Sequence, residues 1–116
     1  MRLKYTEISA YRSRTLQEQS SRCALCGDLI LGDAVLDHDH KTGRIRKVLH
    51  RGCNSMLGKI ENNMARSLMT VERLESWAQN LVNYIKTSHT DLIHPTHKEP
   101  KRAKVKKIAE ETIETS

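Results

Sequence analysis

The chain has 116 residues, enough for one domain of ordinary size. Apolar residues make up 37% of it and aromatic residues only 3%, so we expect a thin hydrophobic core that needs a further stabilising element. The net charge of +6 favours a polyanionic partner. The first residues form no apolar signal segment, and no run approaches the roughly 18 apolar residues of a membrane span. These features argue against secretion and membrane insertion and indicate a cytoplasmic protein.

The N-terminal part of the chain predicts an amphipathic helix. Thr6 is a suitable N-cap, and Ile8, Tyr11 and Leu16 recur at roughly helical spacing as far as about Gln19. A serine pair directly afterwards predicts the end of this helix.

The middle of the chain predicts a β-hairpin followed by a short helix. A strand that begins at Ala34 leads into the tetrapeptide 37–40, and residues 41–43 have the composition of a turn. Residues 44–49 then alternate basic and apolar side chains, as a half-buried strand does. A short helix is expected to open in 50–58.

A further helix is expected after Thr70, a suitable N-cap. Its apolar residues fall on one face, which we expect to pack into the core. They are Val71, Leu74, Ala78, Leu81 and Ile85. From 88 to 116 the composition changes, and we expect a polar tail that is basic first and then acidic. The predicted class is α+β, with one domain at 1–87 whose core spans 23–60.

Two pairs of metal-ligand residue types bracket the predicted hairpin. Cys23 and Cys26 form the first pair, His50 and Cys53 the second, and each two-residue spacer places both ligands on one side of a tight turn. Gly27 can adopt the positive φ that such a turn requires. Three cysteines cannot all form disulfides, so we predict a structural Zn²⁺ with four protein ligands. The alternative is that the cysteines are ordinary buried residues and His50 a surface residue.

The tetrapeptide Asp37-His38-Asp39-His40 concentrates ionisable groups at a strand end, which is typical of a functional site. Alternation on a strand would point His38 and His40 to one face and the aspartates to the other. Asn54 directly follows a predicted zinc ligand, so the zinc site would fix its position relative to the hairpin. These residue types suit phosphodiester hydrolysis, which needs a cation, a base and phosphate contacts.

Each of these roles has a candidate. Asp37 and Asn54 offer hard oxygen ligands for Mg²⁺ or Mn²⁺. His38 can accept a proton at neutral pH, and His40 can donate a hydrogen bond to the phosphate. Basic residues along the hairpin and just after it are candidates for contact with the DNA backbone. They are Lys41, Arg44, Arg46, Lys47 and Arg51.

Residues 23–58 resemble the phage recombination endonuclease VII family, part of the His-Asn-His (HNH), or ββα-metal, nucleases. The motifs are CALC (23–26), LDHDHKTGRIR (36–46), HRGCN (50–54) and LG (57–58). The resemblance implies a zinc-stapled ββα-metal core with flanking helices and a basic C-terminal tail.

The same resemblance implies roles for individual residues. Asp37 and Asn54 would bind the catalytic metal, His38 would be the general base and His40 would contact phosphate. Cys23, Cys26, His50 and Cys53 would hold structural zinc. His50 stands where the family usually has Cys, an exchange of one zinc ligand for another. A phage origin would place the protein in the bacterial host cytoplasm, where it would act on DNA either alone or beside another phage protein.

Three functions follow from these observations. The first is a metal-dependent endonuclease that nicks or cuts duplex DNA. The second is a resolvase of Holliday junctions or other branched DNA with the same chemistry. Resolution of a junction needs a dimer, and the helical part of the chain after Gly58 is short for a dimer interface. The third is a non-catalytic zinc-containing module that binds DNA.

Overall fold

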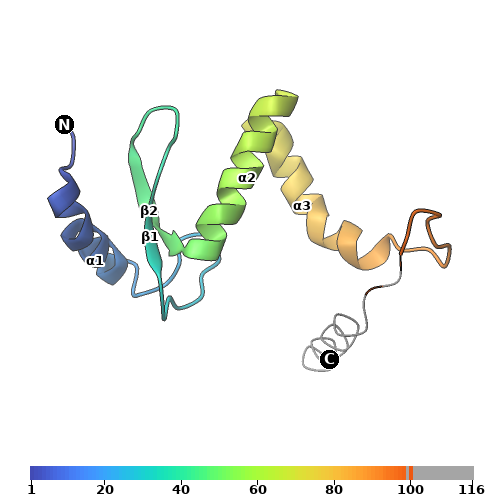
Figure 1. Cartoon of the computed structure of the whole chain (residues 1–116), viewed down its shortest axis with the longest axis horizontal. Helices are drawn as coiled ribbons and strands as arrows, with labels where there is room; N and C mark the ends of the chain where they lie inside the picture. The colour runs from blue at the N-terminus through green and yellow to red at the C-terminus, as the bar shows by residue number, and fades with distance from the viewer. Residues whose placement is uncertain (99, 101–116) are drawn as a thin grey trace. The chain divides into compact units, whose positions relative to one another are not determined.

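The computed structural model describes residues 1–98 and 100. Its elements follow in the order η1 (Tyr5–Glu7), α1 (Ile8–Glu18), β1 (Ala34–His38), β2 (Ile45–His50), α2 (Arg51–Ser67) and α3 (Val71–Thr87) (Figure 1). The chain divides into two compact units, Met1–Leu74 and Glu75–Ser116. A two-stranded sheet with α-helices on either side of it in the chain confirms the α+β class. Of the tail predicted at 88–116, residues 99 and 101–116 lie outside the described part of the chain.

The first helical segment begins earlier than predicted. Lys4, rather than Thr6, is the N-cap of the 3-10 turn η1. The Glu7 carboxylate accepts a hydrogen bond of 2.9 Å from the Lys4 backbone N–H, and the Glu7 N–H donates to the Lys4 carbonyl over 2.9 Å. This reciprocal capping satisfies two backbone groups at once, which explains why Thr6 is not used.

The hairpin pairs β1 and β2 antiparallel, from Ala34 opposite His50 to Leu36 opposite Val48. The register then shifts, so that His38 lies opposite Ile45. An irregularity of this kind adds a residue to one strand and changes the direction in which the next side chains point. The turn closes through Gly43, whose φ of +76° is readily adopted only by glycine, and whose N–H donates to the Asp39 carbonyl over 2.7 Å.

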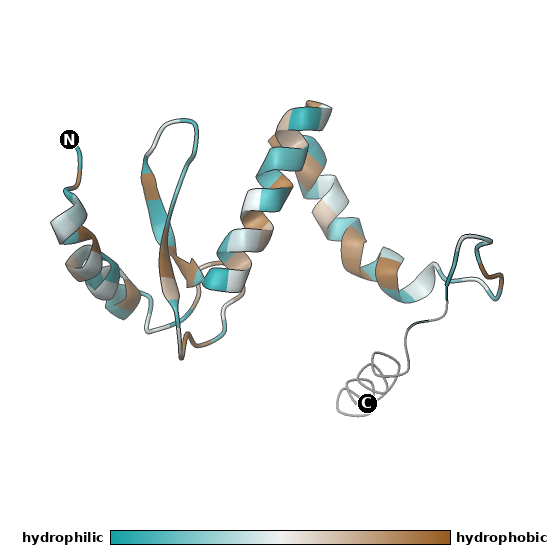
Figure 2. Cartoon of the chain, in the orientation of Figure 1, coloured by the Kyte–Doolittle hydropathy of each residue, from teal (hydrophilic) through white to brown (hydrophobic). Residues whose placement is uncertain are grey.

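A small core lies where the hairpin meets the zinc-ligand loops. Its buried apolar members are Cys23, Ile30, Val48 and Leu49. Half-buried side chains from α1, β1 and α2 pack against them, and both helices contact both strands (Figure 1). Figure 2 shows the apolar residues of the hairpin in brown between these helices. The core is as thin as the composition predicted.

Gln19 joins the end of α1 to β2. Its Nε2 donates to the Val48 carbonyl over 2.9 Å, and its Oε1 accepts from the Val48 N–H over 2.9 Å. Nε2 also donates to the Arg22 carbonyl over 2.8 Å. The Gln19 amide thus pairs with Val48 as a neighbouring strand would, on a residue with 0% exposure.

The two C-terminal helices differ from the sequence prediction in length and burial. Helix α2 is longer than the short helix predicted to open in 50–58, since it runs on to Ser67, where Leu68 terminates it with φ 54° and ψ 37°. Thr70 does cap the next helix, because its Oγ1 accepts a hydrogen bond of 3.1 Å from the Arg73 N–H. The expectation that the apolar face of α3 packs into the core is wrong, since α3 has no buried residue. No helix in the described part of the chain is both long and apolar enough to span a membrane.

Candidate active site and metal centre

The hairpin places the four ionisable residues of 37–40 in different surroundings. Asp37 is buried with 6% exposure, whereas His38 and His40 are exposed. The His38 and His40 rings lie with their centroids 4.7 Å apart at a tilt of 45°. Two imidazoles are therefore available on one face, next to a carboxylate that points into the protein.

Asp39 has a turn-forming position. Its Oδ1 accepts hydrogen bonds from the backbone N–H groups of Lys41, at 2.7 Å, and Thr42, at 3.2 Å. These N–H groups hold the pKa of the Asp39 carboxyl below its ordinary value. Asp39 thus shapes the turn that carries His40.

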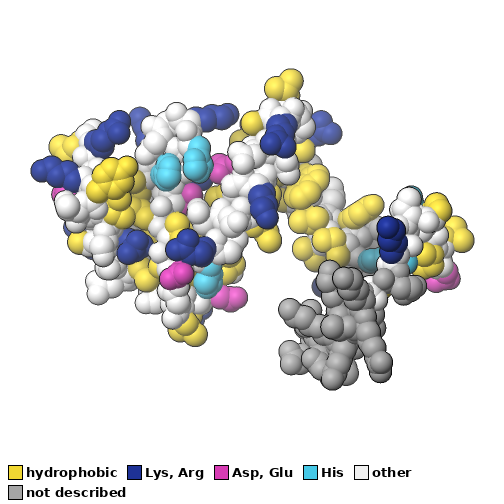
Figure 3. Space-filling view, in the orientation of Figure 1, with side chains coloured by type: hydrophobic (Ala, Val, Ile, Leu, Met, Phe, Trp, Pro, Cys, Tyr) yellow, Lys and Arg dark blue, Asp and Glu magenta, His cyan; other side chains and the backbone are white. Residues whose placement is uncertain are grey.

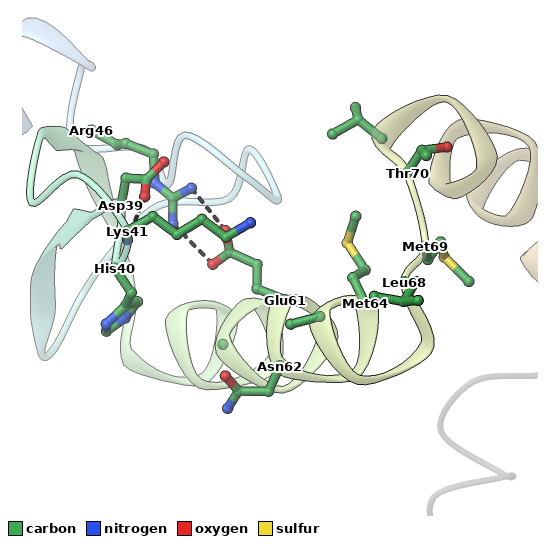
Figure 4. A pocket seen from close by; sticks show the side chains of 13 residues that line it. Asp39, His40, Lys41, Arg46, Glu61, Asn62, Met64, Leu68, Met69 and Thr70 are labelled. Atoms are coloured by element: carbon green, nitrogen blue, oxygen red, sulfur yellow. Dashed lines mark hydrogen bonds and ion pairs between the residues drawn. The ribbon is translucent and has the colours of Figure 1, made fainter.

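The Asp37 carboxylate faces an arginine. Arg46 Nε lies 2.6 Å from Asp37 Oδ2, and Nη2 lies 3.2 Å from Oδ1. The same guanidinium reaches Glu61 of α2, with Nη1 3.0 Å from Oε2 and Nη2 3.1 Å from Oε1 (Figure 4). The hydrogen bonds that Arg46 donates to Glu61 and then to Asp37 raise the pKa of Arg46, so it stays charged.

Asn54 lies on the first turns of α2, directly after Cys53, and is half-buried. Helix α2 contacts β1, the strand that carries Asp37. The amide oxygen of Asn54 and the carboxylate of Asp37 are hard donors that Mg²⁺ accepts. The donor chemistry therefore fits a divalent ion, but both Asp37 oxygens already contact Arg46, which the ion would have to displace or share.

The structure brings the four predicted zinc ligands together. One ligand atom each of Cys23, Cys26, His50 and Cys53 lies within 4.8 Å of the others. His50 Nδ1 is 3.3 Å from Cys26 Sγ and 3.9 Å from Cys53 Sγ. Tetrahedral zinc with bonds of about 2.0–2.3 Å requires ligand atoms about 3.5–3.8 Å apart, close to these separations. Gly27, with φ +85°, closes the first turn as predicted.

The surroundings of the ligands also fit zinc. His50 Nε2 lies 2.9 Å from the Leu29 carbonyl, so an N–H there leaves the Nδ1 lone pair directed at the sulfurs. Burial alone would raise the pKa of the Cys23 thiol, but backbone N–H groups lower it to about 6. Burial and the neighbouring sulfurs raise the pKa of Cys53 to about 11. Thiolates gathered this closely repel one another, and a bound Zn²⁺ would supply the charge that balances them.

The basic residues predicted to contact DNA divide into two groups. Lys41, Arg44 and Lys47 are exposed, whereas Arg46 is bound by two carboxylates. Arg51 forms an exposed ion pair with Asp33 at 3.2 Å. Figure 3 shows histidine side chains over the hairpin with lysine and arginine side chains around them. This face has the charge and the titratable groups that a phosphate backbone would meet.

The sequence profile of the recombination endonuclease VII family matches residues 1–87. The chain belongs to the recombination endonuclease VII family. The matched range includes the helices α1, α2 and α3 and every candidate site residue. A comparison with curated proteins gave no significant match. Endonuclease VII membership makes DNA the substrate and a nuclease or a resolvase of branched DNA the activity. The Cys-and-His group of this family member could hold structural zinc.

Glu61 is a site residue that the motifs do not reveal, although it lies seven residues after Asn54 and therefore on the same side of α2. Gln19 is a structural residue, and nothing local in the sequence indicates its contact with Val48. The helical spacing between Asn54 and Glu61 is the sequence signal that points to Glu61.

Proposed function

We propose that this chain is a divalent-metal-dependent HNH-type DNA endonuclease that nicks or cuts duplex DNA, with His38 as the general base. The observation that carries the proposal is the exposed pair of imidazoles 4.7 Å apart, next to the buried Asp37 carboxylate. The extent of the family match supports residues 1–87 as the nuclease domain.

The residues divide the chemistry between them. His38 takes a proton from water as the water oxygen bonds to phosphorus, and the opposite phosphorus–oxygen bond breaks. His40 donates a hydrogen bond to a phosphate oxygen, and the exposed Lys41, Arg44 and Lys47 hold the backbone. A Mg²⁺ or Mn²⁺ held by Asp37 and Asn54 would neutralise charge on the phosphate and the leaving oxygen.

The test is plasmid cleavage. Zinc-loaded wild type should convert supercoiled plasmid to nicked or linear DNA with Mg²⁺ or Mn²⁺, and His38→Ala should lower the rate about 100-fold or more, as expected for a lost general base. His89→Ala makes the same exchange at an exposed histidine outside the site and should leave the rate unchanged. Intact plasmid with every metal would refute the enzyme and favour a DNA-binding module. Equal cleavage by His38→Ala would place the base elsewhere.

A specific observation favours branched DNA as a second candidate substrate. Helix α3 exposes large apolar side chains, with Trp77 at 47%, Val82 at 58% and Ile85 at 57%. Such residues are typical of a helix that pairs with another chain, and resolution of a junction needs two active sites. The comparison is the cleavage rate on a four-way junction against linear duplex of the same sequence, with the mass in solution measured by sedimentation. A monomer with equal rates would exclude resolution.

A further inference from the structure

Arg46 divides one guanidinium between two carboxylates from different elements. It reaches Asp37 on β1 through Nε and Nη2, and Glu61 on α2 through Nη1 and Nη2. Nη2 also lies 3.4 Å from the His38 carbonyl. Asp37 is 6% exposed, whereas Glu61 is 35% exposed. The buried Asp37 carboxylate therefore needs the charge of Arg46 more than the half-exposed Glu61 carboxylate does.

The charges show what a divalent ion would change. A buried carboxylate needs a cation, and among the described residues Arg46 alone forms an ion pair with Asp37. An ion of charge +2 on Asp37 would take over that role and repel the guanidinium. Glu61 is already in contact with Arg46 through both of its oxygens, so it can hold the displaced charge.

There is also space for the displacement. Arg46 and Glu61 line a hollow of about 980 Å³, together with His40, Lys41 and residues of α2 (Figure 4). Arg46 is 32% exposed and approaches Glu61 from the side of the hairpin. A small rotation of its side chain toward this hollow would break the contact with Asp37 and keep the contact with Glu61.

We propose that Arg46 is a positioning residue that occupies Asp37 as a resident cation and moves onto Glu61 when a divalent ion binds. The proposal rests on the proposed function in one respect, the assignment of Asp37 as a ligand of that ion. Arg46 balances the charge of the buried carboxylate and orients it before the ion arrives. Glu61 makes the exchange possible because it provides the second position for the guanidinium.

The test measures Mn²⁺ binding by the zinc-loaded full chain, through the electron paramagnetic resonance signal of free Mn²⁺. Arg46→Gln should lower the Kd about tenfold, because it removes a cation next to the ion. Glu61→Gln should raise the Kd, because Arg46 then keeps Asp37 as its one carboxylate. Arg66→Gln removes the same charge from an exposed position in the last turn of α2 and should change the Kd less than twofold.

A double-mutant cycle separates action through Arg46 from direct contact with the ion. Glu61→Gln should have little effect on the Kd in the Arg46→Gln background if Glu61 acts through Arg46. An equal effect in both backgrounds would make Glu61 a ligand and overturn the proposal. An unchanged or higher Kd in Arg46→Gln would overturn it as well. If Arg46→Gln does not fold, the Kd of Glu61→Gln for Mn²⁺ is the test. An unchanged Kd in Glu61→Gln would refute the movement of Arg46 between the two carboxylates.

Asp37→Asn distinguishes the failure of this inference from failure of the proposed function. It should abolish the Mn²⁺ site that the other variants modify. Full Mn²⁺ binding by Asp37→Asn would remove the ion from Asp37 and refute both. Loss of binding in Asp37→Asn with no effect of Arg46→Gln would refute the exchange and leave the ion on Asp37. A purely structural role of Arg46 would lower stability without tightening Mn²⁺ binding.

Discussion

Gln19→Ala should destabilise the nuclease domain more than any comparable change on α1, because it leaves the backbone of a fully buried strand residue without its partner. Val48 has 0% exposure, and its N–H donates to Gln19 Oε1 over 2.9 Å. The Val48 carbonyl has a second donor, the Ala24 N–H at 3.2 Å, so it stays satisfied in the variant. The main loss is therefore one buried N–H without an acceptor.

The size of the effect follows from these contacts. A buried donor left unsatisfied costs about 1–3 kcal/mol, and the two lost bonds from Nε2 contribute about 0.5–1.5 kcal/mol each. Allowing for water near the half-buried Gln19, we expect a loss of about 2–4 kcal/mol in the free energy of unfolding. In a domain of this size, about 1 kcal/mol lowers Tm by about 4–8 °C.

The assay is urea denaturation of zinc-loaded wild type and variant, followed by far-ultraviolet circular dichroism. Gln17→Ala, an exposed exchange of the same kind two positions earlier on α1, is the matched control and should stay within about 0.5 kcal/mol of wild type. A loss below about 1 kcal/mol in Gln19→Ala, or equal losses in the two variants, would refute the pairing of Gln19 with Val48 as a stabilising contact.

The remaining predictions concern the zinc group and the end of α2. A strong chelator should unfold the domain, because structural zinc contributes about 10–16 kcal/mol and the buried apolar core consists of Cys23, Ile30, Val48 and Leu49. A melting curve that neither chelation nor Cys53→Ser alters would contradict a structural metal. Leu68→Gly should stabilise the fold by about 0.5–1 kcal/mol, since Leu68 is 88% exposed at φ 54°. Leu68→Ala keeps the unfavourable φ, so an equal gain there in urea denaturation would exclude strain as the cause.

Features set by residues close in sequence could be predicted. The spacing of Cys23 to Cys26 and of His50 to Cys53 gave the group that the structure assembles, because each pair needs only a tight turn. The hairpin and the cap at Thr70 followed from turn chemistry and local hydrogen bonding. Each of these features depends on contacts between residues that are close in sequence, and the metal-ligand group needs only that two such turns meet.

Features set by distant partners could not be predicted. Arg46 alternates with apolar residues as a surface strand residue does, yet its guanidinium contacts Asp37 and Glu61 from other elements. The apolar residues of α3 follow a core pattern but are not buried, since a periodic face does not specify what covers it. Lys4 rather than Thr6 is the N-cap of η1, because the Glu7 carboxylate accepts a hydrogen bond from the Lys4 N–H.

Two polar anchors join α2 to the rest of the site, in addition to its apolar packing against the core, and they act on different parts of that helix. Zinc binding would fix Cys53 in its first turn, and Arg46 holds Glu61 two turns later, about 12 Å along the axis. A second anchor further along a helix restricts its tilt more than the first anchor does alone. Asn54 lies between the two contacts and directly after Cys53, so the zinc group would still hold it when Arg46→Gln removes the second contact. When a divalent ion binds Asp37, the move of Arg46 onto Glu61 would keep the contact between the hairpin and α2. Helix α2 would then hold Asn54 in place while the ion binds.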